Sequence, residues 1–517
     1  MKAVGIRILA SCAALAAAGV GAWQLLPGEE KADPVTVGTV DAVTSLDPAG
    51  GYDTGSWALY SNLFQSLLSF EPGGTQPVPD AASSCAFIGD GLRTYGCTLR
   101  EGLKFSSGRE VTAEDVKYSF DRLLAIDDEN GAASLLTNIK SVEPDGRDVV
   151  FRLKTDDATF PMRIATGAGS IVDREEYPAD KLREGTGVDG SGPYVLKKYK
   201  EKQYAELAPN PDYRGAAHKT GLPVTIRYFE DADALDASWQ KRDVDVASRQ
   251  LPPKVISDTD ATDRDVRVAE GDSAEIRNLV LNVRKGTPFA QRATRQAAAW
   301  LVDRPEVASG AYLDTVEPLY SVIPRGIEGH RTPFFDAYSK PSVAKARKLL
   351  QESGAELPVK IGIGFRAGGG EIRKEASLIE KQLETGGLFD VDVSYHDWQD
   401  FQSGYLNGKF DAYVVGWLAD YPDPDTFAQP LVGTENSLSN GYSNRTIDAL
   451  VVDTQRYSAR ARAVDDFAAL QREVARDVPL IPLWQRKDYV LSTNGVGGTQ
   501  NMTDGSGVYR LWELERI

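Results

Sequence analysis

The fold class is decided by residues 359–417, which read VKIGIGFRAGGGEIRKEASLIEKQLETGGLFDVDVSYHDWQDFQSGYLNGKFDAYVVGW. Apolar residues alternate in two short segments and form a nearly continuous run in a third, which predicts three strands. They recur at helical spacing in the first segment between the strands, and a second helix is expected before the apolar run. The predicted strands are residues 359–365, 391–395 and 410–417, and the predicted helices are residues 372–383 and 397–406. Repeated strand–helix–strand units favour a parallel sheet covered by helices. The stretch therefore predicts an α/β fold.

The same pattern extends over residues of about 290–480, so this whole region is predicted to form one α/β domain. Its last long helix is expected at residues 458–476 and is ended by Pro479. Residues 480–492 then look like strands that return to an earlier domain, which begins with an alternating segment at Val35. A chain that leaves one domain and returns to it predicts two lobes joined by more than one crossover.

Two helices are expected in the first domain. Apolar residues recur at helical spacing between Thr54 and Phe70, which predicts an amphipathic helix there. A second helix is expected to begin at Thr112, because Asp115 stands three residues further on in a variant of the capping box. Both helices are interpreted as scaffold.

Size and charge narrow the function. A chain of 517 residues usually divides into two or more domains. Its 42% hydrophobic and 26% charged residues are ordinary for a globular protein, and exclude a disordered chain or a multi-span membrane protein. The net charge of −17 excludes nucleic acid as a partner, because nucleic-acid binding requires basic patches.

The N-terminus reads as a targeting segment. Lys2 and Arg7 precede an apolar run at residues 8–26, and a charged linker follows at residues 28–34. This order predicts that the rest of the chain lies outside the cytoplasm. The run fits a cleaved signal or a retained anchor. A lipid on Cys12 is a third possibility, because Leu9-Ala10-Ser11-Cys12 resembles a lipobox.

Cys85 and Cys97 bracket a turn at Gly89-Asp90-Gly91, which predicts a hairpin that brings them together. A disulfide is expected in an oxidising compartment, where it would contribute about 3 kcal/mol. Two unpaired buried thiols are the alternative.

Motifs of enzymes, metal sites and cofactors are missing from the sequence. It contains no G-x-S-x-G elbow, no phosphate-binding lysine loop and no H-E-x-x-H zinc helix. The three histidines, His218, His330 and His396, have no paired spacing and are interpreted as surface or hydrogen-bonded residues. Gly362, Gly364 and Ala367 match a dinucleotide fingerprint, but these glycines fall inside a predicted strand rather than in a turn. We therefore expect neither a cofactor nor an enzyme.

The most informative stretch is GWLADYPDPD at residues 416–425, directly after a predicted parallel strand. Ligands of open α/β sheets bind beyond the carboxyl ends of strands, so this loop is placed to line a cleft. Asp420 and Asp423 suit a cationic group, and Trp417 and Tyr421 could shield that group from water. A proline-rich surface turn with solvated aspartates is the alternative.

Five stretches in this sequence resemble the oligopeptide-, dipeptide- and nickel-type substrate-binding proteins of ABC importers, known as solute-binding family 5. They occur in the order typical of that family across nearly the whole chain after the N-terminal segment. The stretches are residues 98–120, residues 190–196 with 210–213, residues 279–289 with 295–297, residues 416–427 and residues 479–483.

The resemblance implies a two-lobed clam of the periplasmic-binding-protein type (type II, cluster C) with an extra subdomain in lobe one. The expected divisions are a signal or anchor segment with linker at residues 1–34, lobe one at 35–285 and 485–517, its subdomain at about 72–188, and lobe two at 286–484.

The resemblance also implies site residues. Asp420 matches the aspartate that pairs with the α-ammonium group of a peptide, and Trp417 matches a neighbouring aromatic residue. Tyr52 and Asn282 lie in stretches that approach the cleft in that family. The sequence therefore predicts a peptide-binding cleft around Asp420.

The predicted function is extracytoplasmic, at the cell membrane or in the envelope, with secretion still possible. A monomer is expected to close around a short peptide or similar small solute and to dock on an ABC permease with its ATPase. A membrane-anchored ligand sensor or a chaperone on the same fold is the main alternative. A hydrolase is the remote one.

Overall fold

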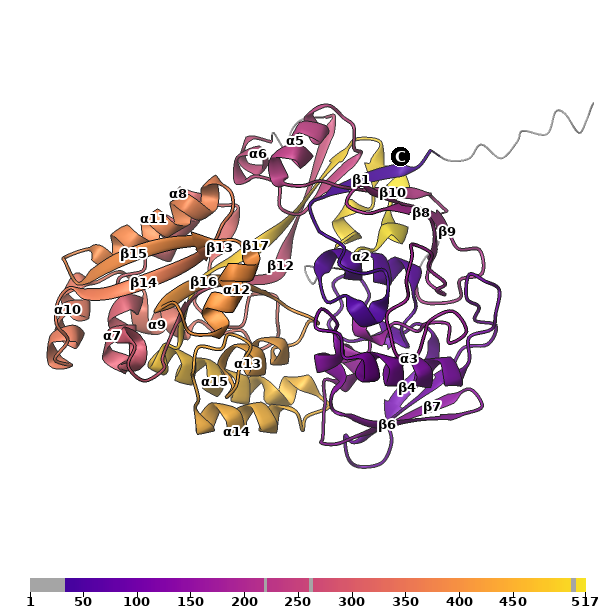
Figure 1. Ribbon diagram of the computed structural model, residues 1–517, viewed down its shortest axis with the longest axis horizontal. Coiled ribbons are helices and arrows are strands. Elements are labelled where there is room, and N and C mark those ends of the chain that lie inside the picture. The colour runs from indigo at the N-terminus through magenta and orange to yellow at the C-terminus, as the bar shows by residue number, and fades with distance from the viewer. Residues whose placement is uncertain (1–32, 218–220, 260–263, 504–507) are drawn as a thin grey trace, which may run out of the picture. The chain divides into compact units, whose positions relative to one another are not determined.

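One mixed sheet runs through most of the chain (Figure 1). The computed structural model describes residues 33–217, 221–259, 264–503 and 508–517. Among these residues eleven strands join in the sheet. Ten follow one another in the order β15 (Phe389–His396), β14 (Val359–Arg366), β16 (Ala412–Leu418), β12 (Val266–Leu281), β17 (Leu480–Thr493), β11 (Val246–Ser248), β1 (Val35–Thr39), β10 (Val224–Tyr228), β9 (Tyr204–Pro209) and β8 (Tyr194–Lys200), while β13 (Val316–Pro318) pairs with β17 at the side.

The stretch that decided the fold class forms the elements that its periodicity predicts. β14 pairs in parallel with both β15 and β16. The crossovers between these strands are α11 (Gly370–Glu384) and α12 (Trp398–Leu406). The α/β prediction is thus confirmed. Gly362 and Gly364 lie within β14, so the match to a dinucleotide fingerprint is indeed coincidental.

Two long antiparallel strands, β12 and β17, connect the two halves of the described chain. At one end Val266 lies opposite Thr493, and at the other end Val280 lies opposite Leu480. One hydrophobic core contains buried residues from Ile276 to Trp484. A second core draws on residues before Val246 and after Val490. The lobe boundaries at 285 and 485 stay a prediction.

A separate four-stranded sheet lies within the region predicted as a subdomain. Its order is β4 (Ala82–Phe87), β5 (Thr94–Leu99), β7 (Asp148–Leu153) and β6 (Ile139–Asp145). Helix α3 (Ala113–Ile126) packs on it through Phe120, whose ring meets Phe151 at 5.0 Å. The backbone N–H of Thr112 donates to Asp115, which confirms the predicted cap. Cys85 and Cys97 stand opposite each other on β4 and β5 and form the predicted disulfide.

One predicted helix is too long. Helix α2 (Thr54–Leu63) ends at Leu63, because Phe64 adopts an extended conformation. The chain then pairs as β2 (Leu68–Ser69) with β3 (Val78–Pro79). Leu67 and Leu68 follow the end of the helix and are buried. Their apolar character therefore indicated burial and not helical structure.

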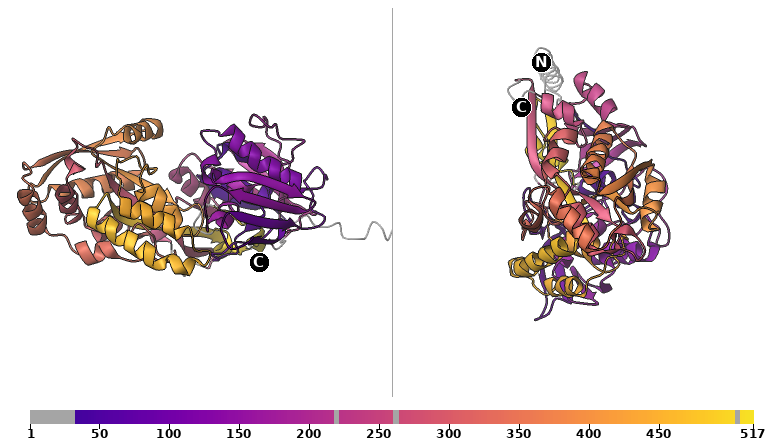
Figure 2. Two further views of the ribbon diagram at one scale, coloured as in Figure 1. Left: turned by 90° about the horizontal axis from the view of Figure 1, so that it is seen from below. Right: turned by 90° about the vertical axis from the view of Figure 1, so that its left-hand side faces the viewer.

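Further helices pack around the sheet (Figures 1 and 2). Helices α14 and α15 lie side by side and bury their apolar faces in the same core. No helix among the described residues is long and apolar enough to cross a membrane. The remaining helices are α4 (Phe160–Arg163), α5 (Ala232–Gln240), α6 (Pro253–Asp258), α7 (Arg292–Ala299), α8 (Arg304–Tyr312), α9 (Pro333–Tyr338), α10 (Val343–Glu352), α13 (Asp425–Val432), α14 (Arg445–Thr454) and α15 (Val464–Asp477).

The predicted targeting segment, with Cys12, lies outside the described residues, as does His218.

Candidate functional site

The loop that the sequence singled out follows the carboxyl end of β16 and ends where α13 begins at Asp425. Its neighbour in the sheet, β14, runs in the same direction, so the carboxyl ends of both strands lie at one edge. This edge is where open α/β sheets bind their ligands.

Asp420 is the residue of this loop that meets the first half of the chain. Its Oδ1 accepts a 2.7 Å hydrogen bond from the hydroxyl of Tyr52, which lies 368 positions earlier. Its Oδ2 accepts a 3.2 Å bond from the hydroxyl of Thr426. The structure thus brings together two residues that the sequence placed at the site.

Partial burial governs the charge of Asp420. It raises the pKa of the Asp420 carboxyl to about 6, although both hydrogen bonds and the charge of Arg163 pull in the opposite direction. Partial burial and the Asp420 carboxylate raise the pKa of Tyr52 well above its usual value, so Tyr52 stays a hydrogen-bond donor. Among the described residues, no cation lies within ion-pair distance of Asp420.

A cation that the sequence reasoning missed lies beside this carboxylate. Arg163, at the end of α4, places Nη2 3.0 Å from Oδ2 of Asp425 and Nε 3.7 Å from Oδ2 of Asp157. Its guanidinium group also lies over the ring of Tyr421, 5.8 Å from the centroid. No sequence motif marks Arg163, which stands 262 positions before its partner Asp425.

These groups form an acidic cluster that its own cations do not neutralise. The cluster contains four carboxylates, those of Asp157, Asp420, Asp423 and Asp425, and two guanidinium groups, those of Arg163 and Arg460. With every carboxyl group ionised, two negative charges are in excess. Excess negative charge among desolvated groups favours the binding of a cation or a proton.

Two residues stiffen the loop. Trp417 is half-buried and donates from Nε1 to the backbone carbonyl of Thr426 at 2.8 Å. Tyr421 is buried, and its hydroxyl donates to Asp425 at 3.1 Å. Both aromatic side chains therefore hold the start of α13 against the end of β16.

Two residues predicted to contact ligand have other partners. Asp423 is buried and accepts from Nε and Nη2 of Arg460 at 2.7 and 2.8 Å, so both of its oxygens are occupied. Asn282 is also buried, and its amide bonds to the carbonyls of Gly408 and Phe410 and to the backbone of Arg284. The interpretation of Asp423 and Asn282 as ligand contacts does not fit this geometry, since each side chain serves its own lobe.

A second cation stands at the same sheet edge. Arg366 is the last residue of β14, and its guanidinium group lies 5.4 Å from the ring centroid of Trp398, which is 43% exposed. Within the described part of the chain, Arg366 has no carboxylate partner. An exposed, unpaired guanidinium group beside an aromatic ring suits an anionic group.

One cavity, of about 340 Å³, borders the loop. It is lined by Ala419 and Pro422, by residues 269–274 of β12 and by residues 73–75. It joins loops from both halves of the chain. Ala419, the residue before Asp420, is thus close to open space.

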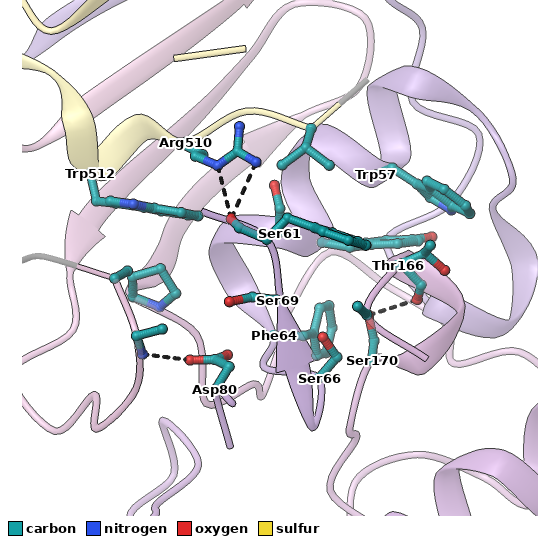
Figure 3. A pocket seen from close by; sticks show the side chains of 18 of the residues that line it. Trp57, Ser61, Phe64, Ser66, Ser69, Asp80, Thr166, Ser170, Arg510 and Trp512 are labelled. Atoms are coloured by element: carbon teal, nitrogen blue, oxygen red, sulfur yellow. Dashed lines mark hydrogen bonds between the residues drawn. The ribbon is translucent and has the colours of Figure 1, made fainter. Parts of the chain in front are cut away.

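A second cavity, of about 360 Å³, is lined by residues of the first half of the chain and by C-terminal residues 508–513, and by no residue of the loop at 416–425 (Figure 3). Trp57 lines it and also packs against Tyr52, with ring centroids 5.4 Å apart. Two of its charged groups have partners within the protein, since Asp80 accepts from Tyr213 and Ala216, and Arg510 donates to the carbonyl of Phe70.

No metal centre is found in the described ranges, where no three His, Cys, Asp or Glu residues are arranged to hold an ion. His330 bonds to the carbonyl of Ile323 and His396 to Ser394.

The sequence profile described as "Bacterial extracellular solute-binding proteins, family 5 Middle" matches residues 76–439. The chain belongs to this family. A curated relative of the family 5 chain is the probable D,D-dipeptide-binding periplasmic protein DdpA of Escherichia coli K12, which is 25% identical over 89% of this chain and 90% of its own length. Di/tripeptide-binding protein 1 of Pseudomonas aeruginosa is 27% identical over 85% of this chain and 86% of its own length.

Solved structures agree with this family 5 assignment in their fold. The periplasmic binding protein DppA of Helicobacter pylori, in complex with the peptide STSA, superposes with a TM-score of 0.80 at 20% identity, covering 94% of this chain and 98% of its own. AgaA of Agrobacterium tumefaciens, in complex with agropinic acid, gives a TM-score of 0.79 at 21% identity, covering 94% of this chain and 99% of its own. The two-lobed α/β fold of a periplasmic binding protein is thereby confirmed. Family members of this kind are binding proteins that work outside the cytoplasm.

Proposed function

We propose that this family 5 protein binds a short peptide between its lobes and delivers it to an ABC importer. The observation that carries the proposal is Asp420, a partly buried carboxylate that accepts a hydrogen bond from the other lobe and has no cation of its own. The α-ammonium group of a peptide supplies the missing charge and three hydrogen-bond donors. Relatives named for dipeptide and tripeptide binding support the same class of solute.

The carboxylate end of the peptide has a candidate partner in Arg366. Arg366 ends β14, and Asp420 follows the carboxyl end of the neighbouring parallel strand β16. A cation and an anion at one edge fit a zwitterionic solute. Trp417 and Tyr421 then act as the rigid support of the loop rather than as direct contacts.

Import partners follow from this assignment. The protein is expected to work as a monomer that closes around the solute and docks on a permease coupled to an ATPase. The segment before residue 34 is proposed to bring it to the envelope, as an anchor, through a lipid on Cys12, or as a signal that is removed. Mass spectrometry of the mature N-terminus separates these three cases.

The decisive experiment compares Asp420→Ala with the wild type by titration calorimetry against a mixture of dipeptides and tripeptides. We expect the substitution to weaken binding by at least about 30-fold, since truncating one partner of a desolvated charge pair typically costs about 2 kcal/mol or more. Asp453→Ala removes an exposed carboxylate of the same lobe and is the matched control. Equal affinity for wild type and Asp420→Ala would overturn the site.

The solute class has its own test, because some relatives bind other molecules. One is named heme-binding protein A of Haemophilus influenzae, 26% identical over 81% of each chain. Extraction of the solute that copurifies with the protein, followed by mass spectrometry, should yield peptides. Recovery of a tetrapyrrole or an opine would show that the solute belongs to that class and would contradict the peptide assignment. Intact peptides after incubation with the protein would argue against a hydrolase.

A further inference from the structure

A group of contacts away from the strands β12 and β17 joins the first lobe to the second. On the first lobe are Asp157, Ala158 and Arg163, at and before helix α4. On the second are Asp425, which begins α13, and Gln455, which follows α14. Arg163 pairs with Asp425 at 3.0 Å, and the backbone N–H of Ala158 donates to the carbonyl of Gln455 at 2.9 Å.

The contact between Arg163 and Asp425 is shielded from water. Asp425 is 2% exposed, and the side chain of Arg163 is 21% exposed. Oδ2 of Asp425 accepts from Arg163 and from the Tyr421 hydroxyl, while its Oδ1 accepts from the side-chain amide of Gln455. The donors Tyr421 and Gln455 come from the second lobe, so Arg163 is the donor that crosses to the first. Removing it leaves a buried carboxylate without its cation, which is costly.

The same contact lies one residue from the proposed solute site. Thr426 follows Asp425 on α13, and its hydroxyl donates to Asp420. The backbone carbonyl of Thr426 accepts from Trp417. Whatever fixes Asp425 therefore also fixes Thr426, whose hydroxyl orients the Asp420 carboxylate and whose carbonyl holds Trp417.

We propose that Arg163 is a positioning residue of the solute site, which acts through Asp425 by fastening the loop at residues 420–425 to the first lobe when the lobes close. This inference rests on the proposed function, because it assigns Arg163 to the site around Asp420. Arg163 does not contact the solute. It stabilises the closed arrangement in which Tyr52 reaches Asp420.

The energetic consequence is a shift between open and closed proteins. A binding protein whose closed state is already populated binds more tightly than one that must first close. An ion pair made only on closing stabilises the closed state and is broken before the solute leaves. Loss of Arg163 should therefore increase the dissociation rate of the solute more than it changes the association rate.

Opening is measured without solute, in the full chain, with spin labels on the exposed substitutions Glu129→Cys and Ala337→Cys. Pulsed dipolar spectroscopy then reports the distance between the lobes. We expect Arg163→Met to shift the distance distribution towards longer values and Arg163→Lys, which keeps the charge, to restore most of the shorter population. The matched control is Arg93→Met, which removes an exposed cation paired with Asp156 in the same lobe.

Stopped-flow measurements with the probe trialanine complete the test. Arg163→Met should raise the dissociation rate by on the order of tenfold, because truncation of a desolvated charge pair acts mainly on that rate. The proposal is overturned if Arg163→Met leaves the interlobe distance unchanged, or if it binds trialanine more tightly. The second result would mean that Arg163 competes with the solute for the cluster. If the wild type itself fails to bind trialanine, the peptide assignment fails, while the distance measurement still decides the role of Arg163.

Discussion

Two acidic turns, each leading into a helix, differ in where their countercharges come from. In the first turn of α3, Asp115 pairs with Arg109 at 2.5 Å, and Arg109 also reaches Asp173 at 2.7 Å. Arg174 lies 3.6 Å from the Asp115 carboxylate. At the start of α13, Asp423 pairs with Arg460 and Asp425 with Arg163, but Asp420 has hydroxyl partners alone. The first turn has two arginines for its two buried carboxylates, one of them from its own segment. The second takes its cations from distant parts of the chain and is left one short at Asp420.

The difference separates a carboxylate that holds the fold from one that, as we propose, is available to a solute. Asp115 and Asp173 are fully or almost fully buried and bonded to guanidinium, so they have no capacity for a further cation. Asp420 is partly buried, and the groups around it carry excess negative charge. All of these residues are aspartates, and the number of arginines near each carboxylate determines whether it stabilises the fold or is free to bind a cation.

Breaking the neutralised turn should have the largest effect. Arg109→Met leaves the buried Asp173 without a cation and the buried Asp115 with Arg174 alone, at 3.6 Å, and we expect the free energy of unfolding to fall by about 3–5 kcal/mol. Urea denaturation measures this loss. Arg147→Met, which removes the exposed partner of Glu101, should change the same free energy by less than about 1 kcal/mol. Equal stability of the two variants would contradict the assignment of Arg109 to the fold.

Binding at the proposed solute site around Asp420 should instead respond to pH. Since the pKa of Asp420 lies at about 6, the free protein takes up a proton there as the pH falls through that value. A cationic solute needs the ionised carboxylate, so affinity should fall below pH 6 by up to about tenfold per pH unit and level off above it. Tyr52 and Arg163 do not account for such a profile, because the pKa values of both are raised above ordinary values that already lie higher. Burial also raises the pKa of the neighbouring Asp425 carboxyl, so a variant at Asp420 identifies which carboxyl titrates.

Calorimetry on both sides of pH 6 gives this profile, and buffers of different ionisation enthalpy report the proton released on binding. Asp420→Asn should bind weakly at every pH and release no proton. A profile that keeps its midpoint in Asp420→Asn would assign the titration to another group.

Which features could be predicted from the sequence depends on how far apart along the chain the interacting residues lie. Periodicity over a few residues found β14, α11, β15, α12 and β16, and a turn between two cysteines found the disulfide. Asp420 was predicted as a site residue from its place after a strand and from the resemblance to family 5, and this assignment stays a prediction. Its hydrogen bond with Tyr52 brings two of the predicted site residues together.

Ion pairs and hydrogen bonds between residues far apart in the chain could not be predicted from the sequence. Arg163 meets Asp425 across 262 positions, and nothing in its segment distinguishes it from other surface arginines. Asp423 and Asn282 have the residue types of ligand contacts, but their polar atoms are already bonded within their own lobe. A single sequence specifies which groups exist and leaves open which of them neutralise one another.

The smallest expected effect tests how much a single hydrogen bond contributes to the pKa of Asp420. Thr426→Val removes the hydroxyl that donates to Oδ2 of Asp420 but keeps the backbone carbonyl that holds Trp417. Without that donor the ionised carboxylate is less stable, so the midpoint of the pH profile should move upward and affinity at neutral pH should fall by about fivefold, the value of one hydrogen bond. Thr446→Val, at an exposed position on α14, is the control. If the midpoint does not move, the Thr426 hydroxyl does not influence the pKa of Asp420, and burial alone raises it. The difference between Asp420 and the paired carboxylates of α3 would then come from solvation and not from hydrogen-bond donors.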